Sequence, residues 1–212
     1  MSKKYVQYGC GLQAPKEWLN FDASPTLRIQ KIPIIGKIIS SKLNVIFPSN
    51  VLYGDIIKGL PGIEPNSCDG VFCSHVLEHL SLSDFRVALQ NTYEILKPGG
   101  IFRCILPDLE KAAKHYLSEL SNNNSEASIS FLSETMLGSV KRYRGLKALL
   151  TFYFGNSQHL FMWDRLSLES ELRKAGFQRI QLSNYNESKD EMFKLTEVKG
   201  RFENAICFEV EK

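Results

Sequence analysis

Hydrophobic residues along the chain fall into short continuous runs separated by longer, more polar segments. The runs are rich in β-branched and aromatic residues and are bounded by glycine, proline, asparagine or aspartate, which is typical of buried β-strands. They predict strands at residues 5–8, 18–21, 50–53, 69–73, 101–106, 177–182 and 205–210. Because helical segments lie between most of these strands, the pattern predicts an α/β fold built on a parallel sheet.

The clearest helix is predicted to begin after Ser81. Ser81 and Asp84 resemble a capping box, in which side chains at the start of a helix bond to its free amides. One face of this helix is hydrophobic and comprises Phe85, Ala88, Leu89, Thr92 and Leu96. The Lys-Pro-Gly-Gly sequence at 97–100 is expected to end it.

Two further helices flank an irregular insertion. Asp108 can cap a helix that runs through Tyr116, and Ser167 can cap another that ends at Gly176. The insertion at about 121–163 begins with a polar loop and then mixes basic, aromatic and methionine residues. Such a mixture predicts a lid over a substrate pocket, and a helical subdomain packed on the sheet is a compatible alternative.

A basic amphipathic segment at residues 27–42 follows the second strand. Its isoleucines alternate with four basic side chains, as in helices that lie on a membrane surface. More often such a segment is a helix packed on a sheet, with its lysine and arginine side chains extending outward. We expect the second arrangement here.

Length and composition favour a single domain spanning residues 1–212. The net charge of +3, with 23% charged residues, excludes a strongly basic nucleic-acid binder and favours small or neutral partners. The first residues lack the hydrophobic stretch of a signal peptide, and the segment 32–39 is too short to span a bilayer, so we expect a cytoplasmic protein without a transmembrane helix. Five scattered cysteines are expected to be reduced core residues.

Polar groups follow the ends of the first five predicted strands, and parallel strands bring these ends to one edge of the sheet. Two glycines that free the backbone to approach a ligand precede an acid that can accept hydrogen bonds from ribose hydroxyls. This order suggests an adenosine-containing cofactor. Only about ten residues separate the second glycine from the acid, half the spacing of dinucleotide-binding folds, which disfavours NAD. The groups are Gly9, Gly11, Asp22, Asp55, Ser74, His75 and Asp108.

Taken together, six motifs in this order resemble the Rossmann-like, class I S-adenosylmethionine-dependent methyltransferases. The similarity covers most of the chain and is greatest to a bacterial branch often found beside glycan and cell-surface polysaccharide genes. Towards the C-terminus it includes His159, Trp163-Asp164, Ser167-Leu168 and Ala175-Gly176-Phe177. The six motifs are Gly9-Cys10-Gly11, residues 18–22 (WLNFD), Gly54-Asp55, residues 73–80 (CSHVLEHL), residues 96–100 (LKPGG) and residues 106–109 (LPDL).

The resemblance implies a seven-stranded, mostly parallel sheet with helices on both faces and an antiparallel last strand beside the fifth. It implies that the glycines frame the methionine part of S-adenosylmethionine, that Asp22 holds the ribose, and that Asp55 and the backbone of Ile56 meet the adenine. The family usually has an acid where this chain has Gln7, which brings no charge. The cofactor-binding residues implied are Gly9, Cys10, Gly11, Asp22, Ala23, Asp55, Ile56, Ser74 and His75.

The acceptor implied by the resemblance is a small molecule or a sugar, most readily a hydroxyl group. Much of the catalysis of methyl transfer comes from alignment of acceptor, methyl group and sulfur, and a weak nucleophile also needs a base. The candidates are His79, His159 and His75, followed by Asp108, since an imidazole near neutral pKa can take the proton. A packed, hydrogen-bonded role for His79 is an equal alternative.

Three other functions stay open. The sequence His75-Val76-Leu77-Glu78-His79 spells H-x-x-E-H, an inverted zinc-hydrolase motif, but only about one helical turn separates the preceding strand from the next helix, so no metal site is expected. The Lys-Arg-Tyr-Arg sequence at 141–144 could contact nucleic acid, although no wider basic stripe accompanies it. Gln7 makes plausible a catalytically inactive relative that keeps the fold for binding.

Overall fold

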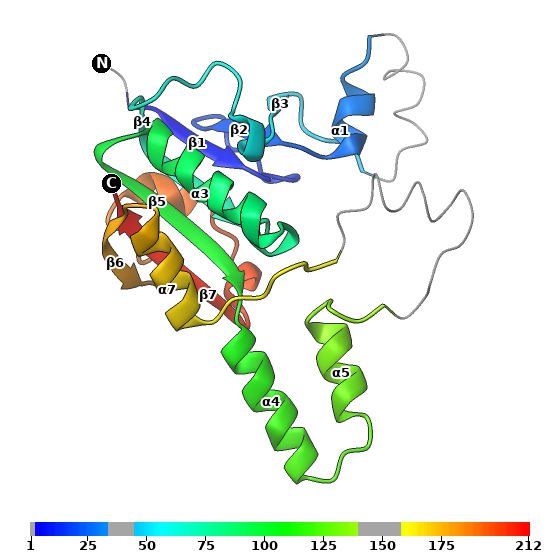
Figure 1. Ribbon diagram of the computed structural model, residues 1–212. Helices are drawn as coiled ribbons and strands as arrows, with labels where there is room; N and C mark the ends of the chain where they lie inside the picture. Colours follow the sequence, from blue (N-terminus) through cyan, green and yellow to red (C-terminus); the bar gives the residue numbers. More distant parts are fainter. Residues whose placement is uncertain (1–2, 34–44, 140–157) are drawn as a thin grey trace.

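The computed structural model describes residues 3–33, 45–139 and 158–212. Within these residues the strands form one seven-stranded sheet in the order β3-β2-β1-β4-β5-β7-β6 (Figure 1). Strands β1 to β5 are parallel, whereas β7 is antiparallel and lies between β5 and β6. This confirms the predicted Rossmann-like fold with an antiparallel last strand. The strands are β1 (Tyr5–Tyr8), β2 (Leu19–Asp22), β3 (Val51–Tyr53), β4 (Cys68–Ser74), β5 (Leu96–Pro107), β6 (Gln178–Leu182) and β7 (Ala205–Glu211).

Helices α3 and α7 cover one face of the sheet (Figure 1). The larger hydrophobic core lies under them, where Val6 and Tyr8 of β1 share one cluster with Phe85 and Leu172. The α-helices are α1 (Pro25–Gln30), α3 (Leu82–Ile95), α4 (Leu109–Ser121), α5 (Ala127–Glu134) and α7 (Arg165–Lys174). The 3₁₀-helices are η2 (Ile56–Lys58), η3 (Leu77–His79), η4 (Glu191–Leu195) and η5 (Lys199–Phe202).

The opposite face is covered by the segment between β6 and β7, which the hydrophobic pattern did not resolve. Successive strand residues point to opposite faces, so Tyr5 joins a second cluster with Trp18 and Phe72. Phe193 of η4 closes this cluster, and the Trp18 indole donates to the Met192 carbonyl at 3.1 Å. Helices η4 and η5 are too short to show a helical repeat, which explains why the sequence did not predict them.

The capping residues set the helix boundaries. Ser81 and Asp108 are the N-caps of α3 and α4, as predicted. The prediction that Ser167 caps α7 was wrong. Asp164 is the cap, its carboxylate accepting from the Ser167 amide at 2.8 Å, and Ser167 completes the capping box from inside the first turn. Leu96, expected on the hydrophobic face of α3, instead begins β5, where it pairs with Cys68.

Helices α4 and α5 form a hairpin that projects from the carboxyl end of β5, away from the sheet (Figure 1). The rings of Tyr116 and Phe131 hold them together at 5.4 Å between centroids. Residues 140–157 of the predicted insertion, with the basic sequence at 141–144, lie outside the described residues. The helix expected over 27–42 ends early: α1 stops at Gln30 with Lys31 as its C-cap, and a turn follows at 31–33. Leu27 is buried, and residues 34–44 lie outside the described residues.

All five cysteines are buried and unpaired, as predicted for core residues. Burial, together with the Asp22 carboxylate, raises the pKa of the Cys10 thiol to about 12, so this thiol stays protonated at neutral pH. In the described parts of the chain, every helix is too short or too polar to cross a membrane.

Candidate functional site

The order of the strands reverses between β1 and β4. From β1 the chain proceeds outward to β2 and β3, and it then returns to β4 and continues to β5 on the other side. Ligands of open α/β sheets bind at the carboxyl ends of the strands at such a switch point. The residues there are Gly9 after β1 and Ser74 at the end of β4, so two of the candidate residues from the sequence lie at this switch point.

The two glycines of the loop after β1 serve different purposes. Both have a positive φ, +63° at Gly9 and +55° at Gly11, which glycine adopts readily. A Cβ atom on Gly9 would lie 2.1 Å from a methyl carbon of Val76, so packing requires a glycine there. A Cβ atom on Gly11 would meet no described atom within 4 Å. The loop therefore leaves open space at Gly11, where a ligand can approach the backbone.

Asp22 ties this loop to the end of β2. One carboxylate oxygen accepts from the Gly11 amide at 3.0 Å and the other accepts from the Ser24 amide at 2.7 Å. The carboxyl group is largely buried, whereas the neighbouring Ala23 is exposed. Because each carboxylate oxygen can accept a second hydrogen bond, Asp22 can order the loop and still receive two hydroxyl groups.

Gln7, which stands where the methyltransferases that the sequence resembles usually have an acid, is buried in β1. Its amide nitrogen donates to the Gln13 carbonyl at 2.6 Å and also to the Asn20 side chain. Both amide hydrogens are thus used to fix the turn, and the amide oxygen remains as an uncharged acceptor. This arrangement gives Gln7 a role in holding the glycine loop.

Asp55 lies beyond β3, next to the end of β2. Its carboxylate accepts from the Ile57 amide at 3.0 Å and caps η2, in which Ile56 is buried. The Gly54 amide donates to the Asp22 carbonyl at 3.2 Å, which fixes the two strand ends relative to each other. The predicted cofactor-binding residues therefore lie along one edge of the sheet, from η2 to the end of β4.

A second group of residues begins where β4 ends. The Ser74 hydroxyl is buried without a hydrogen-bond partner among the described residues. His75 has a φ of +54°, a strained value for a side chain of this size, of the kind that clusters at functional sites. Its Nε2 donates to the Arg201 carbonyl at 2.8 Å. Arg201 lies in the segment between β6 and β7, and no local sequence pattern indicates its contact with this site.

Glu78 lies at the centre of this group, in η3. Its side chain is 1% exposed, and neither carboxylate oxygen has a hydrogen-bond donor in the described parts of the chain. His75 Nδ1 is 3.4 Å from Glu78 Oε1 and His159 Nε2 is 3.9 Å from the same oxygen. The sequence pattern includes Glu78 only as part of H-x-x-E-H, and its position between two histidines was the available signal for this role.

The segment around His159 is fixed against η3 by its backbone. The amides of Leu160 and Phe161 donate to the Glu78 carbonyl at 2.8 and 3.1 Å. The rings of His79 and His159 meet edge to face, with centroids 4.9 Å apart. All three histidines predicted as bases are thus brought together around one buried carboxylate, from segments about eighty positions apart in the sequence.

The environments of the histidines move their pKa values in opposite directions. Burial lowers the pKa of His75, but the Glu78 carboxylate and the Arg201 carbonyl outweigh it, so the net shift is upward. Burial dominates at His159 and lowers its pKa despite the nearby Glu78. The lowered pKa keeps the His159 imidazole neutral at pH 7.

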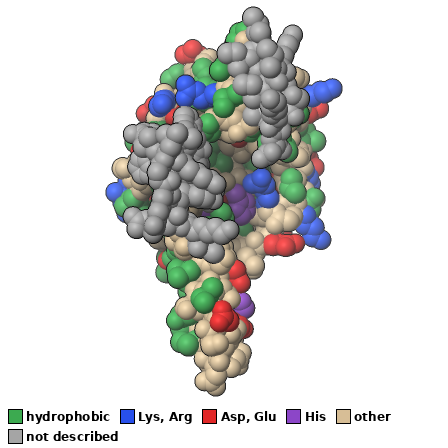
Figure 2. Space-filling view, turned by 90° about the vertical axis from the view of Figure 1, so that its right-hand side faces the viewer, with side chains coloured by type: hydrophobic (Ala, Val, Ile, Leu, Met, Phe, Trp, Pro, Cys, Tyr) green, Lys and Arg blue, Asp and Glu red, His purple; other side chains and the backbone are tan. Residues whose placement is uncertain are grey.

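A cavity of about 780 Å³ opens beside this group, bounded by the end of β5 and the α4–α5 hairpin. Figure 2 shows histidine side chains on the corresponding face, above the projecting hairpin. Asp108 also lines the cavity, and one of its oxygens accepts two amides as the cap of α4. The lining includes His75, Asp108, Lys111, His115, Thr135 and His159.

Comparison with known proteins identifies a methyltransferase domain in part of the chain. Residues 7–104 match the family model of a methyltransferase domain, and no curated protein sequence matches the chain. A solved S-adenosylmethionine-dependent methyltransferase from Archaeoglobus fulgidus is 15% identical, over 99% of this chain and 86% of its own, with a TM-score of 0.49. Phosphoethanolamine N-methyltransferase 2 of Haemonchus contortus, solved with S-adenosyl-L-methionine, is 14% identical over 100% of this chain and 49% of its own, with a TM-score of 0.50.

The Haemonchus contortus structure shares its fold with this chain. The match of residues 7–104 to a methyltransferase domain supports the predicted enzyme class, an S-adenosylmethionine-dependent methyltransferase, and S-adenosylmethionine as its cofactor.

Proposed function

We propose that this chain transfers a methyl group from S-adenosylmethionine to a hydroxyl group of a small molecule or a sugar used in glycan assembly. The observation that carries the proposal is the junction at the end of β4. On one side lie the open loop at Gly11 and the carboxylate of Asp22, and on the other His75 opens onto the 780 Å³ cavity. The choice of a sugar follows the family resemblance.

The residues at the switch point fit the cofactor. The free space at Gly11 would receive its methionine part, the remaining lone pairs of Asp22 would accept the two ribose hydroxyls, and Asp55 with the amide of Ile56 would meet the adenine amine. The unpaired Ser74 hydroxyl can bond to a ligand at the end of β4. When bound, S-adenosylmethionine supplies an electrophilic methyl group on its sulfonium.

The cavity would hold the acceptor. Its lining combines imidazole, carboxylate, hydroxyl and lysine groups with apolar side chains such as Pro107, Met136 and Met162, so it can contact both the hydroxyl groups and the apolar ring faces of a sugar. In this proposal His75 and His159, which line it, would receive the proton of a hydroxyl group, whereas His79 does not line it. The described parts of the insertion, residues 121–139 and 158–163, would contribute to the lid, since Glu134, Thr135 and Met136 form part of the cavity wall.

Calorimetric titration of the purified protein with S-adenosylmethionine and S-adenosylhomocysteine tests the cofactor site first. We expect Asp22→Ala to weaken binding about tenfold to a hundredfold, the equivalent of about 1.5–3 kcal/mol for hydrogen bonds to a charged group. Asp69→Ala is the matched control, because Asp69 lies at the opposite end of β4 and pairs with Lys97 there. It should leave the affinity unchanged, and NAD should not bind.

Screening of sugars and nucleotide-linked glycan precursors as methyl acceptors would follow. Formation of a methyl ether with release of S-adenosylhomocysteine would establish the reaction. Equal affinity in wild type and Asp22→Ala would remove Asp22 from the site. Cofactor binding without turnover on any acceptor would instead indicate a binding protein that keeps the methyltransferase fold.

A further inference from the structure

Three of the four histidines of this chain converge on Glu78, and this cluster does more than supply a base. The ligand atoms of Glu78, His79 and His159 all lie within 4.8 Å of one another. Two imidazoles and one carboxylate are a donor set that binds divalent transition-metal ions. We propose that Glu78, His79 and His159 form a binding site for one divalent transition-metal ion at the wall of the acceptor cavity.

The unpaired carboxylate is the first argument. A buried ionised carboxylate without hydrogen bonds is costly, so such groups in folded proteins are paired or bind a metal. The nearest nitrogens lie 3.4 Å (His75) and 3.9 Å (His159) from Glu78 Oε1. The second distance is too long for a hydrogen bond and the first lies at the limit, so protons on these rings satisfy the carboxylate poorly. A cation between the side chains would satisfy it.

The tautomer of His79 is the second argument. Its Nδ1 lies 3.0 Å from the backbone carbonyl of Gln158, and a carbonyl can only accept. The proton of the neutral ring is therefore on Nδ1, which leaves the lone pair on Nε2. A histidine that donates one ring N–H to a carbonyl and offers the other nitrogen is the usual arrangement of a metal-binding histidine.

The third argument is the fit of the distances. Two ligands at about 2.1 Å from a tetrahedral ion lie about 3.4 Å apart. The 3.9 Å between His159 Nε2 and Glu78 Oε1 must therefore shorten by about half an ångström on binding, and the other pairs of ligand atoms, all within 4.8 Å, by at most about 1.4 Å. His159 Nδ1 is buried without a well-formed hydrogen bond to any described residue, with the backbone of Thr135 nearby. The backbone bonds between η3 and residues 160–161 already hold the two segments together.

This arrangement differs from the H-x-x-E-H motif of a zinc hydrolase. That motif needs both histidines on one helix, whereas His75 lies at the end of β4 with a positive φ and only His79 is in η3. The partner of His79 is His159, far along the chain, and Glu78 is a ligand in place of a base. Three protein ligands leave a coordination position free, and His159 places the ion at the cavity wall.

A role in catalysis would follow only if the proposed methyl transfer is correct. An ion with a free position can bind an acceptor oxygen and lower the pKa of its hydroxyl group. His159 would then act as a ligand. The metal site itself rests on the geometry alone and can be tested without cofactor or acceptor.

The test is a titration of chelator-treated protein with Zn²⁺ and with Co²⁺, whose visible absorption reports the ligands. We expect one ion per chain, a rise in melting temperature on addition of Zn²⁺, and a Co²⁺ spectrum typical of nitrogen and oxygen ligands. Glu78→Gln and His79→Gln should each weaken binding at least tenfold. His115→Gln is the matched control, since His115 lines the same cavity outside the cluster and should leave binding unchanged.

Circular dichroism of each variant separates loss of a ligand from loss of the fold. If both Glu78→Gln and His79→Gln are unfolded, the stoichiometry, melting shift and Co²⁺ spectrum of the wild type still decide the question. Absence of saturable binding to the folded wild-type protein, unchanged affinity in both variants, or a thiolate-type Co²⁺ spectrum would each overturn the proposal. Metal binding without methyl transfer would leave this site in place and remove only the proposed reaction.

Discussion

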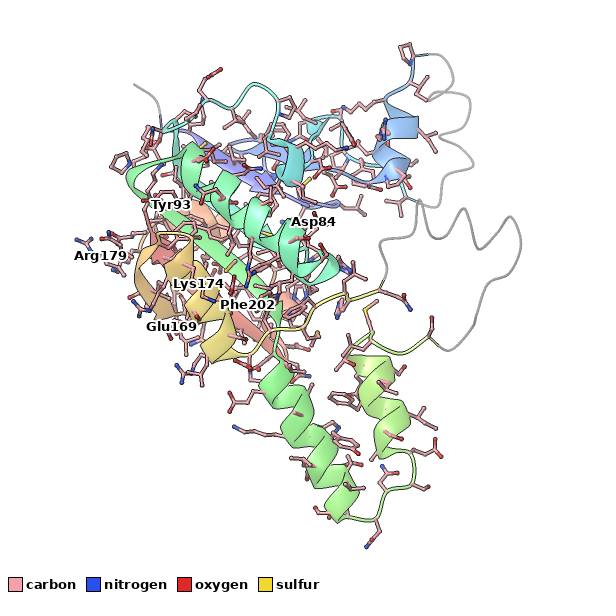
Figure 3. All side chains as sticks on the ribbon, viewed as in Figure 1. Asp84, Tyr93, Glu169, Lys174, Arg179 and Phe202 are labelled. Carbon is pink, nitrogen blue, oxygen red and sulfur yellow. The ribbon has the colours of Figure 1, made fainter. Side chains whose placement is uncertain are left out.

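Two clusters of buried charged side chains lie at the sheet, and they differ in how fully their charged groups are hydrogen-bonded. Arg103, in the middle of β5, is fully buried, and its guanidinium donates to two carboxylates, a hydroxyl and a backbone carbonyl. Glu197, one of the carboxylates, also accepts from the Asn186 amide at 2.6 Å. Phe202, labelled in Figure 3, lies 5.8 Å from the guanidinium carbon. Every part of this cluster has a partner.

Glu78 is buried to the same extent, yet its carboxylate has no described hydrogen-bond donor. The difference follows position in the fold. Arg103 lies in mid-strand under the segment between β6 and β7, whereas Glu78 lies past the carboxyl end of β4, beside the cavity. The charge of Arg103 is surrounded by partners, whereas the carboxylate of Glu78 keeps lone pairs that we expect a ligand to use. Stability and binding measurements can separate the two.

Removal of Arg103 should give the largest loss of stability. Arg103→Met leaves Glu197 and Glu209 buried without their cation, and breaking a buried pair in this way costs about 3–5 kcal/mol. Urea unfolding followed by circular dichroism measures it. Arg179, labelled in Figure 3, is the control, because its pair with Glu211 is on the surface and Arg179→Met should cost less than about 1 kcal/mol. Equal losses in the two variants would contradict the contrast.

Substitution of the two loop glycines should also give unequal losses of unfolding free energy, both smaller than that of Arg103→Met. Gly9→Ala places a methyl group into Val76 and strains a positive φ, which should cost about 2–4 kcal/mol of unfolding free energy. Gly11→Ala meets open space and should cost only about 1–2 kcal/mol of strain. We expect Gly11→Ala to impair S-adenosylmethionine binding in a folded protein. Normal binding in that variant would show that the open space is not the cofactor site.

Glu171 of α7 is another buried carboxylate, and its two partners lie at the surface. Arg86 and Lys174 hold it and lower its pKa from 4.5 to about 2. Figure 3 shows Lys174 on the same helix. A carboxyl group with a folded pKa below its unfolded value stabilises the protein above the unfolded value, and this contribution is lost as pH falls through the folded pKa. Because Arg86 is half exposed, we discount the contribution to about 1–2 kcal/mol.

Measurement of the free energy of unfolding between about pH 5 and pH 2, the range set by the two pKa values, tests the contribution of Glu171. Wild-type protein should lose the contribution of Glu171 across that range, and Glu171→Gln should lose correspondingly less. Parallel curves for the two proteins would show that the pair contributes nothing measurable.

The sequence predicted the framework of this molecule better than its site. Strands and the first cofactor residues were accessible because β-branched runs, glycines and strand-end acids are local signals. The cluster around Glu78 depends on His159 lying against η3 and on Arg201 contacting the end of β4, and both are long-range contacts that no local pattern encodes. Helices η4 and η5 were also not predicted, and Asp164 caps α7 in place of the predicted Ser167.

The smallest predicted effect on stability, from Glu78→Gln, is the most informative. In metal-free protein the substitution removes a buried charge that has no described donor, so the free energy of unfolding should fall by less than about 1 kcal/mol or should rise. Removal of Arg103, buried to the same extent, should cost several times more. Zn²⁺ should raise the melting temperature of the wild type and not that of Glu78→Gln. A loss as large as that of Arg103→Met would mean that Glu78 is held by the fold, and its lone pairs would then not be available to a metal ion.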